Sequence, residues 1–298
     1  MSNTKTPDNG KRSSIYSNNK GNTKIKNKNN IKMIALDLDD TLLRTDLTIS
    51  WHTRRIIKKA QALGIVVVIA SGRVLKALDR YVKMLGMKKM YGYLICGNGT
   101  TIHDTKSGSI LEQTLIPSKT ACAAFDLANA EGFAVQLYRN DIIYVSRDNE
   151  YSDTDRRLTG MGHIVPHNFR EMVEQSCDKL VIPGDPFLLR PLETLMRNIL
   201  GDDATLFTSK PYYLEVLPPS TDKGSALKKI AEKLGIDRAD VMAFGDSMND
   251  EAMLRWAGWG VAMVNGDERV RKIARYVSES TNDEEGVART IEKYVLRG

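Results

Sequence analysis

Short apolar segments that end in clusters of charged and hydroxyl side chains are the feature that most restricts the fold of this sequence. Three of them, residues 31–36, 65–70 and 241–244, are rich in β-branched or aromatic side chains, which is typical of buried parallel strands. Helical patterns lie between them along the chain. Strands that alternate with helices predict βαβ units around a parallel sheet, so we expect an α/β fold.

The helical patterns have clear starts and ends. Ser50 suits the N-cap of a helix and Gly64 lies just past its last turn, as is common at helix termini. We therefore expect a helix over about residues 50–63. The same reasoning gives the other elements of this layer, namely helices over 74–85, 223–234 and from Asp250, and strands over 93–96 and 259–263.

Four polar clusters either follow one of these strands or open a helix. They are Asp37-Leu38-Asp39-Asp40-Thr41, Ser71-Gly72-Arg73, Asp222-Lys223-Gly224 and Gly245-Asp246-Ser247-Met248-Asn249-Asp250. Ligands of open α/β sheets bind beyond the carboxyl ends of the strands. We therefore expect the four clusters to meet in one crevice.

The acidic residues of these clusters suit a metal ion. Asp37 and Asp39 are two residues apart, so at the end of a strand they can point to the same side. Two close carboxylates repel each other unless they share a proton or a cation. Magnesium prefers a few carboxylates together with phosphate oxygens and water. Asp246 and Asp250, on a second strand-to-helix turn, could complete its ligand shell.

The remaining polar residues suit a phosphate group. Lys223 offers a compact positive charge, and Ser71 and the amide of Gly72 offer hydrogen bonds at a helix start. Each cluster alone is also compatible with a solvated turn or a plain helix start. The ordered conjunction of all four predicts one site for a metal ion and a phosphate.

The pattern changes between about residues 115 and 213. Two long helical patterns, 119–131 and 186–200, occur there together with alternating segments over 134–138 and 142–146. The segments flank Arg139-Asn140-Asp141, a turn sequence typical of a hairpin. We expect an α+β domain inserted into the first domain, with the βα pattern returning at Tyr213. The predicted division is a tail over 1–30, a core over 31–113 and 213–298, and an inserted domain over 114–212.

The tail carries the net charge of the chain. Residues 1–30 hold seven basic residues and one acid, which equals the +6 of the whole sequence, so the remainder is formally neutral. With almost nothing apolar to bury, the tail should be disordered. A basic arm can bind nucleic acid or an anionic surface. We favour a spacer, and we expect no nucleic-acid partner for the rest of the chain.

The sequence favours a cytoplasmic protein without a membrane partner. No apolar stretch approaches the ~18 residues that span a bilayer, and the N-terminus lacks the apolar segment of a secretory signal. Three cysteines (Cys96, Cys122 and Cys177) show no paired spacing, which disfavours disulfides and zinc knuckles. The oligomeric state is not predicted.

At the four clusters the sequence resembles the haloacid dehalogenase superfamily, and specifically its Cof-type sugar-phosphatase branch. The resemblance covers about residues 31–298 and extends to Ile95-Cys96-Gly97-Asn98-Gly99, to Tyr213-Leu214-Glu215-Val216-Leu217-Pro218 and to residues 276–287. It implies a Rossmann-like parallel-sheet core whose inserted α+β domain acts as a cap. Two departures are Asp40, where the family often has Gly, and Thr221-Asp222, where a Ser is frequent.

The resemblance also implies roles for individual residues. Asp37 would be the nucleophile that forms an aspartyl phosphate, and Asp39 would protonate the leaving alcohol and then activate water. The Asp37 carboxylate, the Asp39 backbone carbonyl and Asp246 would hold Mg²⁺. The phosphoryl oxygens would be bound by Ser71, Gly72, Lys223 and Asn249, with Thr41 and Asp250 in supporting positions.

The implied activity is Mg²⁺-dependent hydrolysis of small phosphorylated metabolites. Sugar phosphates are favoured, while flavin mononucleotide and pyridoxal phosphate stay open. Tyr138 or Arg139 of the hairpin are candidate contacts for the leaving group. One alternative is a phosphomannomutase-like mutase, which would need a second phosphate site in the inserted domain and a bisphosphate activator. Another is a non-catalytic binding protein on the same fold.

Overall fold

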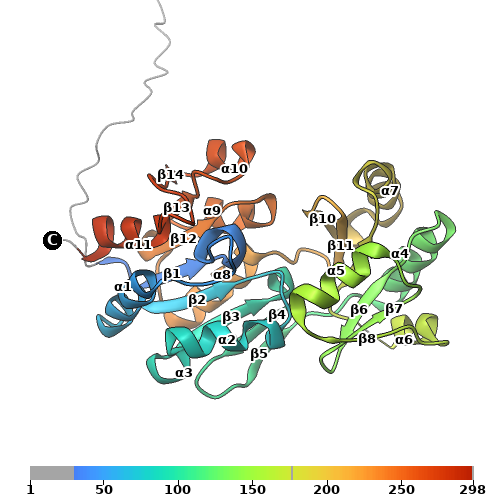
Figure 1. Cartoon of the computed structure of the whole chain (residues 1–298), viewed down its shortest axis with the longest axis horizontal. Helices are drawn as coiled ribbons and strands as arrows, with labels where there is room; N and C mark the ends of the chain where they lie inside the picture. Colours follow the sequence, from blue (N-terminus) through green and yellow to red (C-terminus); the bar gives the residue numbers. More distant parts are fainter. Residues whose placement is uncertain (1–29, 176, 297–298) are drawn as a thin grey trace, which may run out of the picture.

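The computed structural model describes residues 30–175 and 177–296. Residues 1–29, on which the prediction of a disordered basic tail falls, lie outside the described residues. The described chain forms two β-sheets, one of eight strands and one of six, each with its own helices (Figure 1).

The eight-stranded sheet contains the predicted parallel layer. Its order is β14-β13-β12-β1-β2-β3-β4-β5, parallel from β14 to β3 and antiparallel from β3 to β5. In the centre, Met33 of β1 pairs with Val66 of β2 and Val241 of β12. The strands are β1 (Met33–Leu36), β2 (Val66–Ala70), β3 (Gly92–Cys96), β4 (Thr101–Asp104), β5 (Ile110–Gln113), β12 (Val241–Gly245), β13 (Trp259–Ala262) and β14 (Tyr276–Val277). The predicted α/β class is confirmed.

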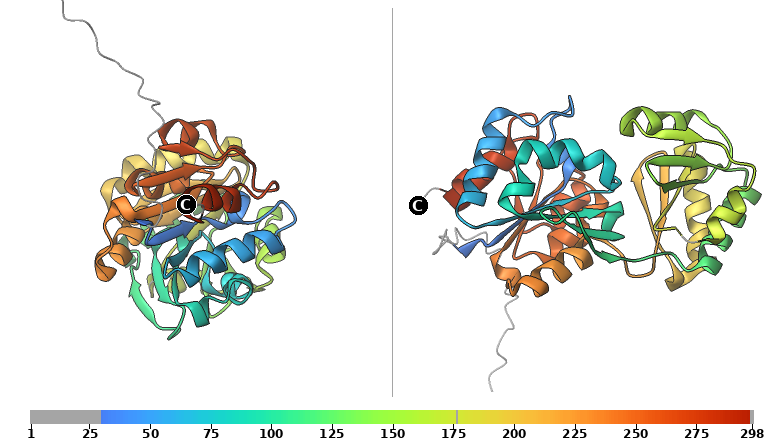
Figure 2. Two further views of the ribbon diagram at one scale, coloured as in Figure 1. Left: turned by 90° about the vertical axis from the view of Figure 1, so that its left-hand side faces the viewer. Right: turned by 90° about the horizontal axis from the view of Figure 1, so that it is seen from below.

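Helices cover both faces of this sheet, because alternate side chains of each strand enter different cores. Ile34 and Leu36 pack with α1, α2 and α11, whereas Met33 and Ala35 pack with α8, α9 and α10 (Figure 2). Burial on both faces explains the nearly continuous apolar strand sequences. The helices are α1 (Trp51–Ala62), α2 (Leu75–Leu85), α3 (Met87–Met90), α8 (Lys223–Leu234), α9 (Glu251–Trp256), α10 (Glu268–Ile273) and α11 (Gly286–Ile291).

Helix starts follow the expected capping chemistry. Ser50 precedes α1 and its side chain accepts a hydrogen bond from the Thr53 amide. Asp222 precedes α8 and accepts one from the Ser225 amide at 2.7 Å. Such caps satisfy amides that have no partner within the helix. No helix in the described ranges is both long and apolar enough to cross a membrane.

The six-stranded sheet is built from residues between β5 and α8. Its order is β10-β11-β9-β6-β7-β8, antiparallel except for the β7–β8 pair. The predicted hairpin is confirmed as β6 and β7, and Asn140 and Asp141 in its turn both have positive φ, as a type I′ turn requires. The strands are β6 (Gln136–Arg139), β7 (Ile142–Val145), β8 (Gly162–Ile164), β9 (Leu180–Pro183), β10 (Thr205–Lys210) and β11 (Tyr213–Leu217).

The two faces of the six-stranded sheet differ in character. One face packs on α4 (Ser118–Ala130), α6 (Phe169–Glu174) and α7 (Pro186–Leu200) through an apolar core. On the opposite face, α5 (Glu150–Thr159) contacts the polar side chains of Gln136 and Tyr138. In Figure 2 this sheet lies beyond one end of the eight-stranded sheet.

One predicted strand joins a different sheet from the one expected. We expected the parallel pattern to return at Tyr213, but β11 pairs antiparallel with β9 and β10. All five residues of β11 are buried, and an apolar sequence gives no indication of which sheet buries it. We therefore propose that the inserted domain covers residues 114–217 and that the second part of the core starts after Leu217. The limits of the first part, 31–113, stay a prediction.

Candidate active site

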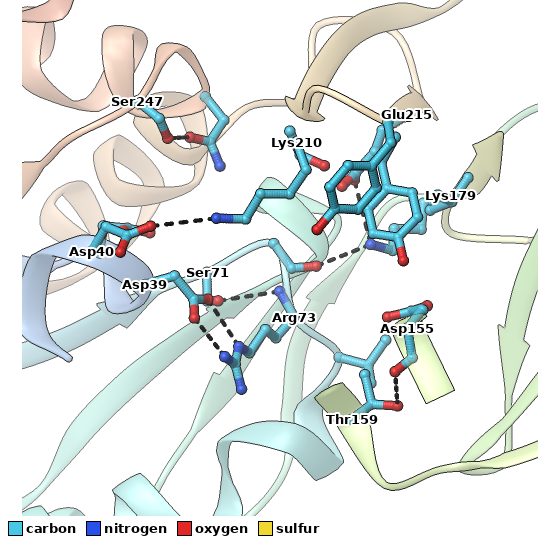
Figure 3. Close-up of a pocket in the computed structure, with 18 of the residues that line it drawn as sticks. Asp39, Asp40, Ser71, Arg73, Asp155, Thr159, Lys179, Lys210, Glu215 and Ser247 are labelled. Carbon is cyan, nitrogen blue, oxygen red and sulfur yellow. Dashed lines mark hydrogen bonds and ion pairs between the residues drawn. The ribbon is translucent and has the colours of Figure 1, made fainter. Parts of the chain in front are cut away.

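The structure brings the four polar clusters together at the carboxyl ends of β1, β2 and β12 and at the start of α8. A cavity at this edge lies between the core and the inserted domain (Figure 3). The core residues that line it include Asp37, Asp39, Ser71, Gly72, Arg73, Asp246 and Asn249. Lys223 and Asp250 lie behind this surface with no exposed area.

Lys223 links two of the acidic residues. Its Nζ lies 2.6 Å from Oδ1 of Asp37 and 2.6 Å from Oδ1 of Asp250. A buried charge is strongly unfavourable unless it is paired and hydrogen-bonded. Burial acts to lower the pKa of Lys223, but the charges of Asp250 and Asp37 raise it above its ordinary value. The ammonium therefore stays charged at neutral pH.

Three carboxylates crowd around this lysine. Asp37, Asp246 and Asp250 each offer one oxygen, and these atoms lie within 4.8 Å of one another. Burial, together with the neighbouring carboxylates, raises the pKa of Asp37 to about 7 and that of Asp246 to about 9. If all three acids were ionised, one lysine would leave negative charge uncompensated, and a bound cation would relieve this repulsion. This set of hard oxygen donors fits a divalent cation.

Other groups fix the orientation of these acids. Thr41 donates a hydrogen bond from Oγ1 to Oδ1 of Asp246 at 2.9 Å. Oδ2 of Asp250 accepts bonds from the backbone amides of Asp246 and Ser247, at 3.0 and 3.2 Å. Asp250 thus contacts both Lys223 and the loop that carries Asp246, and its supporting role stays a prediction.

Asp39 lines the same cavity, but its carboxylate has another partner. Its Oδ2 accepts a bond from Nε of Arg73 at 2.9 Å, and its Oδ1 accepts one from Nη2 at 2.5 Å. Asp37 and Asp39 therefore line the same cavity, but their carboxylates have different partners, Lys223 for Asp37 and Arg73 for Asp39. The chain leaves the extended conformation after Asp37 and Asp40 has φ 58°, so the alternation of a strand no longer sets the directions of these side chains.

Ser71 and Gly72 form a tight loop after β2. Oγ of Ser71 accepts a bond from the Arg73 amide at 3.1 Å, and Ser71 is 1% exposed. A Cβ atom on Gly72 would lie only 2.8 Å from Nδ2 of Asn98. Only glycine fits this close approach without a shift of Asn98.

Asn98, Lys179 and Glu215 form a hydrogen-bonded network next to the predicted site residues, and they are not among the site residues that the sequence predicts. Nδ2 of Asn249 donates to Oδ1 of Asn98, and Nδ2 of Asn98 donates to Oε2 of Glu215, both at 3.1 Å. Nζ of Lys179 lies 3.3 Å from the same glutamate oxygen and donates to the Gly72 carbonyl at 3.0 Å. Lys179 and Glu215 are each 4% exposed. A buried ion pair of the inserted domain thus contacts the predicted phosphate-binding loop at Gly72 directly and is linked to Asn249 through Asn98.

The sequence did contain a signal for this ion pair. Lys179 precedes the apolar strand β9, and Glu215 stands in the middle of the apolar strand β11. A charge inside an apolar segment needs a partner or a function. Glu215 lies in one of the segments that carry the family resemblance, whereas Lys179 lies outside all of them.

The inserted domain lines the other side of the cavity. Its contribution includes Tyr138, Asp155, Thr159, Lys179, Lys210, Tyr212, Tyr213 and Glu215 (Figure 3). Of the two predicted hairpin contacts, Tyr138 lines the cavity. Arg139, which adjoins it in the strand, donates instead to the Met172 carbonyl and to Gln175, because neighbouring strand residues point to opposite faces.

Comparisons with known proteins agree with this geometry. The family model of haloacid dehalogenase-like hydrolases matches residues 34–291. A putative phosphatase of Streptococcus pyogenes is 32% identical and aligns with 89% of this chain and 99% of its own length. A 5-amino-6-(5-phospho-D-ribitylamino)uracil phosphatase of Bacillus subtilis is 33% identical over 89% of this chain and 96% of the relative. The crystal structure of a haloacid dehalogenase-like hydrolase from Bacteroides thetaiotaomicron superimposes with a TM-score of 0.80 at 32% identity, covering 88% of this chain and 98% of that one.

Proposed function

The chain belongs to the Cof-type branch of the haloacid dehalogenase-like hydrolases and is a phosphatase of that family; we propose that it hydrolyses small phosphate monoesters with Mg²⁺ and through a phosphorylated Asp37. The observation that carries the proposal is the contact of Asp37 with the buried Lys223 beside Asp246 and Asp250. This arrangement offers a carboxylate nucleophile next to groups that neutralise a phosphoryl group.

In the first step, an oxygen of Asp37 attacks the phosphorus atom and the bond to the leaving oxygen breaks. Asp39 donates a proton to that oxygen, so the alcohol leaves neutral. In the second step, Asp39 accepts a proton from a water molecule that attacks the same phosphorus. Inorganic phosphate leaves and the Asp37 carboxylate is restored. A covalent intermediate splits one difficult displacement into two easier ones.

The other core residues bind and orient the phosphoryl group. We assign its oxygens to the ammonium of Lys223, the hydroxyl of Ser71, the Gly72 amide and the side chain of Asn249. Ser71, Gly72 and Asn249 line the cavity, and Lys223 lies behind Asp37. When bound, Mg²⁺ would be held by the Asp37 and Asp246 carboxylates and the Asp39 carbonyl and would neutralise charge on the transferring group.

Asp39 must change partners to act as an acid. Both of its oxygens accept bonds from Arg73 in this structure, which stabilises the ionised carboxylate. A proton donor needs one oxygen free for the leaving group. We infer that substrate binding displaces at least one contact between Arg73 and Asp39.

The substrate class is a small phosphorylated metabolite, with sugar phosphates favoured. The relatives are named as phosphatases, one of them for a ribitylamino-uracil phosphate. The mutase alternative would need a free cationic site in the inserted domain. The two lysines of that domain that line the cavity, Lys179 and Lys210, are already paired with Glu215 and Asp40, so no observation favours a mutase. A cytoplasmic location stays a prediction.

The first prediction tests this function directly. The wild-type protein should release phosphate from p-nitrophenyl phosphate with Mg²⁺, and chelation of the metal should stop the release. Asp37→Asn should lower kcat by at least ~10³-fold because the amide is a far weaker nucleophile. Asp240→Asn, which alters an acid of the loop before β12, is the matched control. Wild-type turnover by Asp37→Asn would refute the mechanism.

A further inference from the structure

Asp155 is a buried carboxylate in the cavity that the proposed mechanism does not use. It lies on α5 of the inserted domain, is 8% exposed and lines the same cavity as Asp37 and Ser71. Figure 3 shows its side chain directed from α5 toward Lys179, while its backbone carbonyl accepts a bond from Thr159. A carboxylate at this depth needs partners, because burial of a charge is costly.

The protein satisfies only one oxygen of this carboxylate. Oδ2 accepts a bond from the Tyr138 hydroxyl at 2.5 Å and from Nε2 of Gln136 at 3.0 Å. Burial, and after it the charge of Asp155, raise the pKa of Tyr138 well above its ordinary value, so the phenol keeps its proton and donates. Within residues 30–175 and 177–296, no group donates to Oδ1 and Asp155 forms no ion pair.

The surroundings of Asp155 have the character of a binding surface. Ser152 and Thr159 lie on the same side of α5 as Asp155, and the strands opposite present Gln136 and Tyr138. The other face of this sheet packs on its helices through an apolar core. The face toward α5 also carries a small apolar cluster around Ile143 and Val145, against which Tyr138 packs, so the polar groups gather around Asp155.

The two lysines of the inserted domain that line the cavity have other partners than Asp155. Lys179 lies 4.8 Å from the centre of the Tyr138 ring but forms its ion pair with Glu215. Lys210 pairs across the cavity with Asp40 at 3.4 Å. Oδ1 is open to the cavity and is therefore available to a ligand.

We propose, building on the phosphatase function above, that Oδ1 of Asp155 binds an amino group on the leaving group of the substrate. The favoured substrates are then phosphate esters that carry an ammonium or amino nitrogen in place of a hydroxyl. An ammonium neutralises the buried carboxylate and donates a charge-assisted hydrogen bond, whereas a hydroxyl donates only a weaker one. Asp155 is a specificity residue in this assignment and takes no part in phosphoryl transfer.

The test uses two pairs of ligands that differ in one group. They are glucosamine 6-phosphate with glucose 6-phosphate, and 2-aminoethyl phosphate with 2-hydroxyethyl phosphate. Binding is measured by calorimetry with Mg²⁺ on the full chain carrying Asp37→Asn, which prevents turnover during the titration. We expect the amino member to bind ~10-fold more tightly in at least one pair, as for a hydrogen bond to a charged group.

A second substitution separates Asp155 from its surroundings. Addition of Asp155→Asn should bring the affinity ratio of the pair close to one. Addition of Asp153→Asn should leave the ratio unchanged, because Asp153 lies on the same helix but is exposed and paired with Arg156. Equal affinities within both pairs, or a ratio that survives Asp155→Asn, would overturn the proposal.

The result is independent of the proposed catalytic activity. Phosphate release from p-nitrophenyl phosphate by the wild-type protein tests the phosphatase by itself. A protein that shows the Asp155-dependent affinity ratio but releases no phosphate would refute the phosphatase and support the amino-binding site. A protein that releases phosphate but binds both members of each ligand pair equally would support the phosphatase and refute the amino-binding site.

Discussion

At the scale of single residues, the main feature of the site is a group of buried charged side chains. Lys223 has no exposed area, and its ammonium contacts Asp37 and Asp250. Such an ion pair adds little net stability, because desolvation offsets much of the attraction. Its role is to hold a nucleophile and a positive charge at a fixed separation. The loss of one partner, however, leaves the others buried without compensation.

We therefore predict that Lys223→Met is both inactive and destabilised. Removal of one member of a buried pair costs about 3–5 kcal/mol, and urea unfolding without metal measures the change in the free energy of unfolding. Lys228→Met on the same helix is the control. Lys228 is exposed and lies 3.7 Å from Glu232, so its loss should cost less than ~1 kcal/mol. Equal stability of the two variants would contradict this account of Lys223.

At the scale of elements, strands β9 and β11 do more than complete a sheet. Lys179 precedes β9 and Glu215 lies within β11, and their ion pair reaches the Gly72 carbonyl and Asn98 of the core. The loop at Gly72 therefore contacts the inserted domain directly, and Asn249 is linked to it through Asn98. The strain-free packing of these loops depends on glycine at position 72, as the close approach of Asn98 shows.

We predict that the two charges of this pair depend on each other. Glu215→Leu should destabilise the protein by about 3–5 kcal/mol, because it leaves the Lys179 ammonium buried and unpaired. The double variant Lys179→Met with Glu215→Leu should recover much of that stability, since neither charge remains. Urea unfolding of the two single variants and the double variant measures this coupling. Additive losses would show that the two residues act separately.

The double variant also reports on function. With the ion pair removed, the Gly72 carbonyl loses its bond from Lys179, and Asn98, which bonds to Asn249, loses its bond to Glu215. We expect kcat with p-nitrophenyl phosphate to fall while the free energy of unfolding is largely restored. Full activity in the restored variant would mean that the network serves stability alone.

At the scale of the whole molecule, the net positive charge lies in the N-terminal tail and not in the residues that form the enzyme. Residues 1–30 carry a net charge of +6, and the remaining residues are neutral overall. The polar clusters of the site all lie after this segment. The tail could therefore affect turnover through long-range electrostatic attraction of anionic substrates.

We predict that deletion of residues 1–30 leaves kcat at saturating substrate unchanged. Any decrease should be confined to kcat/KM at low salt, since the Debye length falls from ~10 Å at 0.1 M to ~3 Å at 1 M. Steady-state kinetics of the full-length and shortened proteins at several salt concentrations provide the measurement. A folded shortened protein with a small fraction of the full-length kcat would place the tail in the site.

The elements of the core could be predicted because their signals are local. A helix such as α8 is specified by its N-cap Asp222 and by its apolar spacing, which neighbouring residues determine together. Short elements such as β14 and α6 were missed, because two to six residues are too few to show a period. Helix α5 is longer, but its face toward the sheet is polar and its sequence therefore shows no apolar stripe.

The sequence by itself determined the α/β class, the order of the polar clusters and their position at the ends of strands, because burial and capping impose patterns on adjacent residues. The tertiary structure alone decided that Tyr213–Leu217 joins the six-stranded sheet, that Asp39 faces Arg73, and that Lys179 and Glu215 contact the core loops. These contacts join residues far apart in the chain. Their selection depends on which surfaces pack together and which buried charges find partners, and no local pattern records that choice.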